Sequence, residues 1–232
     1  MASNYVLERT RQENRVREIT FAGDKVSLAG QMDYPAERPP LSGTYPLVFV
    51  LHHAGGNTRA DYEHYTRMAL RAGYAVFRWD KRGTGRSGAS GRGSATQDAV
   101  YAYEAALDQP MIDNRRVVIL AQNEATLLLG DTFGLFARLQ APAGVILVGN
   151  MLNEEAVLAI TAPVCIIQGE YDWNQWKRYA RAACAAHNEA YAYGADYYVA
   201  GETHRTLMVE DHQQLRFHKG ARSAMQDWLK SL

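Results

Sequence analysis

The sequence predicts an α/β fold with a doubly wound, mostly parallel sheet of about eight strands and helices on both faces. Three observations favour this fold. Short, continuous apolar runs alternate along the chain with longer helical stretches, and polar turn residues separate the two kinds of segment. A chain of 232 residues, of which 47% are hydrophobic, is long enough to bury one such core. We therefore expect a polar leader at residues 1–15 and a single domain over residues 16–232.

The expected strands begin with a hairpin. Residues 16–22 and 25–34 form its two arms, and the turn lies at Gly23-Asp24. The remaining runs are apolar at consecutive positions, which is typical of strands that helices cover on both sides. They lie at residues 47–51, 74–79, 117–120, 145–148, 164–167 and 196–200.

The stretches between these runs are predicted to be helices on both faces of the sheet, connected by right-handed crossovers. Between the runs at 145–148 and 164–167 there is room for one short helix only, so we expect no cap domain. A site at this edge is then open, or it is covered by the second subunit of a homodimer or by the residues before Val16. The expected helices lie at residues 59–72, 95–108, 124–139, 174–190 and 219–230.

The composition argues against several classes of partner. The 25 basic side chains balance the 25 acidic ones, whereas a protein that binds nucleic acid needs a basic face. No apolar run approaches the roughly 18 residues that cross a bilayer, and the first residues are too polar for a signal peptide. We expect a cytoplasmic protein that binds a small molecule and needs no cofactor, no nucleic acid and no membrane.

A segment near the middle of the chain has the layout of a nucleophile elbow. A buried strand is followed by a turn with small residues at Ala121 and Ala125, and then by an apolar helix. Small neighbours let such a turn tighten and present its central residue at the edge of the sheet. That residue is Asn123, where a nucleophilic serine is usual. The nitrogen lone pair of an amide is delocalised into its carbonyl, so a neighbouring His cannot activate it for attack.

Four further motifs follow predicted strands, one motif to each strand. In these motifs and their order, the chain resembles the α/β-hydrolase superfamily over residues 16–232, and within it the small capless members similar to dienelactone hydrolases and peptidases. The motifs are Leu51-His52-His53-Ala54-Gly55-Gly56-Asn57, Asp80-Lys81-Arg82-Gly83-Thr84-Gly85-Arg86-Ser87, Gly169-Glu170-Tyr171-Asp172 and Gly201-Glu202-Thr203-His204.

The resemblance implies a role in the active site for three of these motifs. His204 stands where the family has its catalytic His, and Asp172 stands where it has the acid that orients this His. The backbone N–H groups of Ala54 and Glu124 stand where the family has its oxyanion hole. His53 replaces the usual Gly and is expected to face the substrate. The residues that we expect to bind substrate are His53, Tyr171 and Trp173.

Asn123 is open to several interpretations. Its amide can position a substrate oxygen or a water while His204, oriented by Asp172, moves a proton. Alternatively it marks a decayed or deliberately silenced elbow, since Asn is among the residues that tolerate the positive φ expected there. A third interpretation makes Asn123 the counterpart of an Asp nucleophile, but relatives of that kind normally carry the cap that this chain lacks.

Other motifs have structural explanations beside the functional ones. Asp172 can instead cap the helix that follows it. His52 and His53 are adjacent, but consecutive side chains on an extended segment point to opposite faces, which argues against a metal site. The string at residues 83–88 matches a dinucleotide-binding fingerprint, yet it does not open a helix directly after a strand. We expect Asp80 and Arg82 to form an ion pair that organises this loop.

Two classes of function therefore remain open. The first is an enzyme that acts on a small carbonyl, ester or lactone compound by acid–base chemistry of His204 and Asp172, without a seryl intermediate. Elimination, decarboxylation, cyclisation and non-covalent hydrolysis qualify, because they need only a proton moved. The second is a catalytically silent homologue, or an esterase inactivated by a serine-to-asparagine change, that acts as a ligand-binding or interaction protein.

Overall fold

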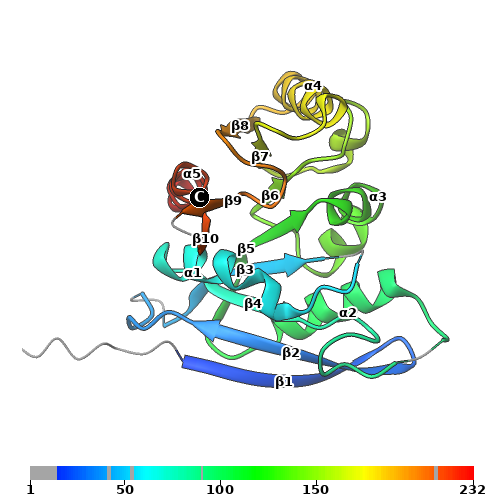
Figure 1. Cartoon of the computed structure of the whole chain (residues 1–232). Coiled ribbons are helices and arrows are strands. Elements are labelled where there is room, and N and C mark those ends of the chain that lie inside the picture. Colours follow the sequence, from blue (N-terminus) through cyan, green and yellow to red (C-terminus); the bar gives the residue numbers. More distant parts are fainter. Residues whose placement is uncertain (1–14, 41–42, 53–54, 90, 212–213) are drawn as a thin grey trace, which may run out of the picture.

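The computed structural model describes residues 15–40, 43–52, 55–89, 91–211 and 214–232. Its main sheet has eight strands in the order β1-β2-β4-β3-β5-β6-β7-β8 (Figure 1). The first two strands are antiparallel to their neighbours, and the other six are parallel to one another. The strands are β1 (Arg15–Gly23), β2 (Val26–Tyr34), β3 (Tyr45–Leu51), β4 (Ala75–Trp79), β5 (Ile112–Gln122), β6 (Gly144–Val148), β7 (Val164–Gly169) and β8 (Ala195–Ala200).

Helices cover both faces of this sheet (Figure 1). α1 and α5 pack against one face, whereas α2, α3 and α4 pack against the other. Two short 3-10 helices, η1 and η2, precede α1 and β7 respectively. The helices are η1 (Arg59–Tyr62), α1 (Glu63–Arg71), α2 (Ala95–Leu107), α3 (Glu124–Leu139), η2 (Ala156–Ala159), α4 (Asn174–Ala190) and α5 (Lys219–Ser231).

The core has two halves because successive strand side chains point to opposite faces. In β3, Phe49 and its alternate neighbours pack towards α2 and α3, while Val48 and Val50 pack towards α1 and α5. All seven residues of β3 are buried. The continuous apolar run in the sequence therefore predicts correctly that this strand is covered on both sides.

The predicted fold class is confirmed, with local differences. The expected helix at 59–72 is divided into η1 and α1, and β5 begins at Ile112, before the expected run. η2 is the only helix in the described connection from β6 to β7, which agrees with the absence of a cap. The predicted leader at 1–15 falls almost entirely outside the described residues.

One element was not predicted. After β8 the chain forms a small antiparallel hairpin of β9 (Met208–Asp211) and β10 (Gln214–Phe217). Each strand has four residues, and charged side chains interrupt the apolar positions, so no strand-like run is visible in this part of the sequence. The hairpin lies between α1 and α5 (Figure 1).

The loop after β4 is held by ion pairs, but the partners differ from those expected. Asp80 pairs with Arg59 at 3.6 Å, and Arg82 pairs with Asp98 at 2.6 Å. The prediction of an Asp80–Arg82 pair was therefore wrong, although both side chains do organise the loop. The backbone N–H of Arg86 donates to Asp80 at 3.0 Å, and a Cβ at Gly85 would lie 2.3 Å from the Asp80 carboxylate. Only glycine fits this close approach.

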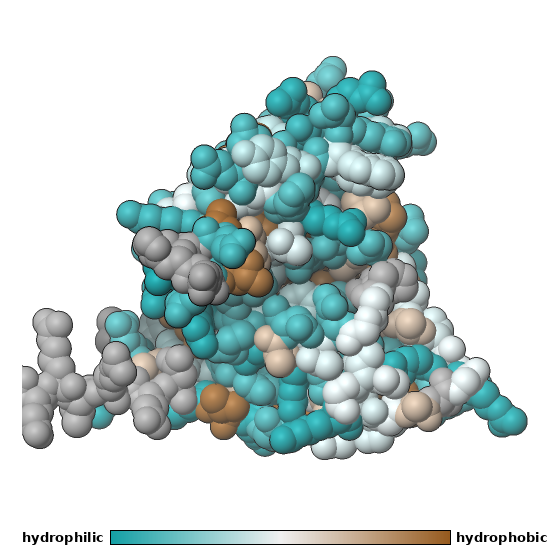
Figure 2. All heavy atoms as spheres, in the orientation of Figure 1, coloured by the Kyte–Doolittle hydropathy of each residue, from teal (hydrophilic) through white to brown (hydrophobic). Residues whose placement is uncertain are grey.

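The face of the molecule seen in Figure 2 is mostly polar. Apolar residues on this face occur singly or in small groups among polar ones. Within the described ranges, no helix is both long enough and apolar enough to cross a bilayer.

Phe49→Ala is expected to lower the free energy of unfolding by about 3–5 kcal/mol, because it removes a buried ring and leaves a cavity. The Phe49 ring is fully buried and lies 5.2 Å from the Tyr103 ring and 6.0 Å from the Phe77 ring, centroid to centroid. Urea unfolding followed by circular dichroism measures the change. The control is Val16→Ala on β1, where the side chain is 56% exposed and the expected change is below about 0.5 kcal/mol. Equal losses in the two variants would contradict this account of the core.

Candidate functional site

The site is built around the turn from β5 into α3. Asn123 is the one residue between these elements, and its φ of 53° and ψ of −122° lie in a strained region for a residue with a side chain. The turn is held by its backbone, since the Asn123 N–H donates to the Val148 carbonyl at 2.9 Å and the Thr126 N–H donates to the Asn123 carbonyl at 2.8 Å. The expected elbow geometry is therefore present without its serine.

The side chain of Asn123 is confined. Its Oδ1 atom is buried and accepts no hydrogen bond from the described residues. A Cβ placed on Gly149 would lie 2.5 Å from this oxygen and 3.0 Å from the Arg205 Cβ. The amide oxygen is thus enclosed between the end of β6 and the loop that carries His204. An unpaired buried carbonyl of this kind costs about 1–3 kcal/mol.

Asp172 lies at the end of β7 and is 7% exposed. Its Oδ2 atom accepts hydrogen bonds from the Gly169 N–H at 3.0 Å and from the Gln168 side chain. Burial raises the pKa of the Asp172 carboxyl, while hydrogen bonds from Gly169, Arg205 and Gln168 and the attraction of His204 oppose this rise. The N-cap of α4 is Trp173, so Asp172 does not cap that helix.

His204 follows β8, at the position expected from the sequence, but its side chain is exposed. Its ring lies against Tyr171, with 5.6 Å between the centroids. Among the described residues, no hydrogen bond joins His204 to Asp172. The carboxylate is held instead by donors of its own turn and by the Arg205 backbone. The structure therefore brings the two residues to neighbouring strand ends without assembling the expected relay.

Arg205 is a residue that the sequence analysis missed. Its guanidinium lies 3.9 Å from the Glu124 carboxylate, and its carbonyl accepts a hydrogen bond from Gln122 at 3.3 Å. Both charged side chains are about half exposed, so this ion pair adds little stability. The ion pair instead helps to hold Arg205 over the elbow, where the Arg205 residue covers the Asn123 Oδ1 atom. In the sequence, only the position of Arg205 directly after His204 indicated that it lies near the site.

Lys81 is the second missed residue. It is 9% exposed, and its Nζ donates to the Gly55 carbonyl at 2.5 Å. Burial lowers the pKa of the Lys81 ammonium, and the Glu124 carboxylate opposes this shift. The Lys81 ammonium therefore lies close enough to Glu124, the first residue of α3, for the two charges to attract each other.

The remaining predicted residues divide into two groups. Ala54, which was expected to contribute to the oxyanion hole, and His53 lie outside the described residues. Glu124 begins α3, and the first N–H groups of a helix have no partner inside the helix. Tyr171 and Trp173 are 55% and 72% exposed, and they flank His204 and the start of α4. Trp173 stacks on Trp176 with 6.4 Å between the centroids.

His52 has a structural role. It is 2% exposed, its Nε2 hydrogen-bonds to the Trp79 carbonyl at 2.7 Å, and its ring packs on Tyr62 and Trp79. Burial lowers the pKa of His52 to about 4, so the ring is neutral at pH 7. In the part of the chain that the structure covers, no three His, Cys, Asp or Glu side chains form a group that could hold a metal ion.

Solved structures with this architecture are numerous. An esterase from Pyrococcus furiosus matches with a TM-score of 0.69 and 15% identity over 94% of this chain and 93% of its own. An esterase from the archaeon Pyrobaculum calidifontis matches with a TM-score of 0.67 and 15% identity over 94% and 85% of the two chains. A predicted CIB-like hydrolase from Thermoplasma acidophilum matches with a TM-score of 0.64 and 14% identity over 95% and 100%.

The fold is that of the α/β hydrolases. At these low identities the likeness establishes the architecture alone. No family model matches the chain, and no curated protein matches it.

His52→Gln is expected to make the protein less sensitive to acid. The folded-state pKa of about 4 lies below the ordinary value of 6.5, so the unfolded chain binds a proton first as the pH falls. The contribution of His52 to stability is therefore complete above pH 6.5 and is lost towards pH 4, by about 2–3 kcal/mol. Gln keeps a donor for the Trp79 carbonyl but does not titrate.

Urea unfolding of both proteins at pH 7, 5.5 and 4 measures this difference. The carboxylates titrate alike in the two proteins, so the wild type should lose more unfolding free energy than His52→Gln over this range. Parallel pH profiles would contradict the lowered pKa, because they would show that His52 has the same pKa in the folded and the unfolded protein.

Proposed function

We propose that this protein is a catalytically silent α/β-hydrolase homologue that binds a small carbonyl, ester or lactone compound at the carboxyl edge of its sheet. The proposal rests on the environment and the chemistry of the Asn123 side chain. The residue in the nucleophile position has a buried amide oxygen, covered by Gly149 and Arg205, and has no group that can attack.

The size of the catalytic deficit supports this choice. Loss of the serine of a triad lowers turnover by about a million-fold. His204 does not compensate, since its ring lies against Tyr171 and forms no hydrogen bond with the Asp172 carboxylate among the described residues. Covalent ester hydrolysis is therefore not expected from this site.

Binding needs fewer groups than catalysis, and described residues at this edge of the sheet supply candidates for them. The first N–H of α3 and the Arg205 guanidinium both suit a carbonyl or carboxylate oxygen. The partly positive end of α3 favours the same polarity. Tyr171 and Trp173 offer flat apolar surface beside them. A small ligand with one polar oxygen and an apolar body fits this set.

Asn123→Ser tests whether the site is only silenced. Because His204 and Asp172 are not joined, we expect the variant to gain less than about tenfold in hydrolysis of p-nitrophenyl acetate. Initial rates measure the gain, and circular dichroism verifies that the variant is folded. The control is the double variant Asn123→Ser/His204→Ala, which should hydrolyse the ester at the same rate as Asn123→Ser. A gain of about a hundredfold that disappears in the double variant would identify a working relay and a silenced esterase.

A second candidate function is an enzyme that moves a proton with His204, without a seryl intermediate. One observation favours it. The raised pKa of the Asp172 carboxyl is partly offset by attraction to His204, so the two groups are close enough to interact. A ligand that drew the exposed His204 ring away from Tyr171 could complete the pair. Elimination, decarboxylation, cyclisation and non-covalent hydrolysis would then be available.

His204→Ala separates the two candidates. The purified protein is first screened for binding and turnover with a panel of activated esters, lactones and β-substituted carbonyl compounds. If His204 carries the proton, its removal should lower turnover about a hundredfold or more. For the silent homologue we expect no turnover in the wild type, and ligand affinity in the variant within about threefold of the wild type. Turnover that survives in His204→Ala would contradict both candidates, the silent homologue and the enzyme that uses His204 to move a proton.

A further inference from the structure

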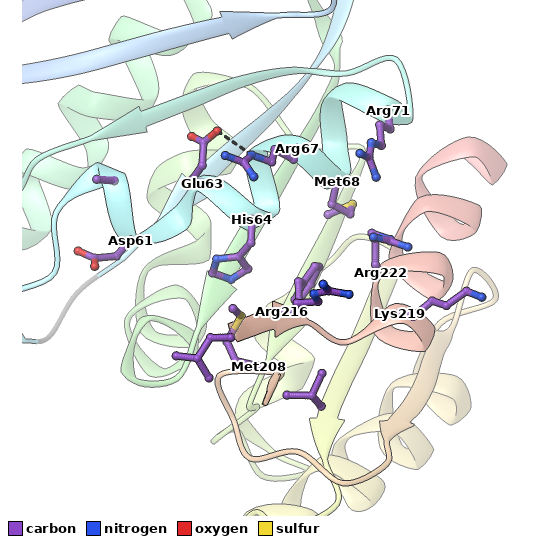
Figure 3. A pocket seen from close by; sticks show the side chains of 14 residues that line it. Asp61, Glu63, His64, Arg67, Met68, Arg71, Met208, Arg216, Lys219 and Arg222 are labelled. Carbon is purple, nitrogen blue, oxygen red and sulfur yellow. Dashed lines mark hydrogen bonds and ion pairs between the residues drawn. The ribbon is translucent and has the colours of Figure 1, made fainter. Parts of the chain in front are cut away.

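A pocket of about 710 Å³ lies away from Asn123, between α1, the β9–β10 hairpin and the start of α5 (Figure 3). Its volume is in the range of sites that bind small molecules. The hairpin that forms one wall is the element that the sequence did not predict. Phe217 fixes this wall against α1, because its ring packs on His64 at 4.9 Å and on Tyr65 at 5.4 Å.

One end of the pocket has an excess of positive charge. Arg71 at the end of α1 and Lys219 and Arg222 at the start of α5 line this end (Figure 3). Among the described residues, these three side chains form no ion pair. Arg71 and Arg222 lie next to each other at this end, whereas Lys219 extends away from them (Figure 3). Because no carboxylate of the described residues pairs with them, they generate a local positive potential, although the net charge of the chain is zero.

The acidic residues of the pocket lie at its other end and are already engaged. Glu63 accepts a hydrogen bond from Arg67 at 3.2 Å, and Asp61 accepts one from the Thr58 N–H at 2.7 Å. Glu63, the nearer of the two acids, begins α1 eight positions before Arg71, which corresponds to roughly 12 Å along the helix. The two acids therefore do not neutralise the basic end.

The floor between the two ends is apolar. Met68 is fully buried, and Met208 and Phe217 face the same space. Burial lowers the pKa of His64 to about 4, so its ring is neutral at pH 7 and belongs to this floor. The His64 Nε2 atom is buried and has no hydrogen-bond partner among the described residues.

We propose that this pocket binds an amphipathic organic anion, with a phosphate or carboxylate head group on an apolar body. Guanidinium groups suit both head groups, because they donate two parallel hydrogen bonds to a pair of oxygens. The head group lies between Arg71 and Arg222, where the partly positive N-terminus of the 13-residue helix α5 adds to the attraction. The apolar body lies along Met68, Met208 and Phe217. This proposal does not depend on the chemistry at Asn123.

Calorimetric titration with four probes of equal chain length tests the ligand class. The probes are octyl phosphate, octanoate, octan-1-ol and octyltrimethylammonium, each kept below its micellar concentration, with inorganic phosphate as a fifth. At least one of the two anionic amphiphiles should bind about tenfold or more tightly than octan-1-ol and than inorganic phosphate. The better of the two identifies the head group. Equal binding of the alcohol and both anions would overturn the proposal.

Arg71→Gln and Arg222→Gln locate the binding. Each variant should lower the affinity for the better anion roughly tenfold, because a hydrogen bond to a charged group is lost. The matched control is Arg178→Gln, an exposed arginine in α4 that lies outside the pocket. Unchanged affinity in both pocket variants, or an equal loss in the control, would contradict the proposed location. Asn123→Ser should leave the affinity for the anion unchanged.

Discussion

The candidate site depends on one strained peptide, the turn at Asn123. A buried strand enters this turn and a helix leaves it, and the positive φ of a single residue makes the reversal possible. Backbone hydrogen bonds to Val148 and Thr126 hold the turn, so its shape does not depend on which side chain the residue carries. The elbow geometry can therefore form with asparagine as well as with serine at this position. The contacts that the side chain at position 123 can make depend on the groups around it. Here Gly149 and Arg205 enclose the oxygen of the Asn123 amide.

Local residue patterns were sufficient to predict the fold. Continuous apolar runs such as β3 predict strands covered on both faces, and the two halves of the core confirm this. The positive φ of Asn123 was also predictable, since small residues on both sides indicated a tight turn. The positions of Asp172 and His204 at strand ends followed from the order of the motifs.

The details that the sequence did not reveal depend on side chains that meet across the fold. The Asp80–Arg82 pair was expected from their proximity in the sequence, but Arg59 and Asp98 come from other elements and form better-placed pairs. The bonding of Asp172 to its own turn could not be predicted, because Gln168 and Gly169 look like ordinary strand residues. The β9–β10 hairpin is too short and too polar to be recognised, and it is stabilised by contacts of Phe217 with α1.

Gly149 constrains which sequences this site can adopt. A methyl group there would meet the Asn123 oxygen and the Arg205 side chain, and the φ of 58° adds a backbone penalty for any other residue. A serine at position 123 is shorter than asparagine and would relieve the first of these contacts. The tolerance of position 149 is thus coupled to the identity of position 123, although the two residues follow different strands, β6 and β5.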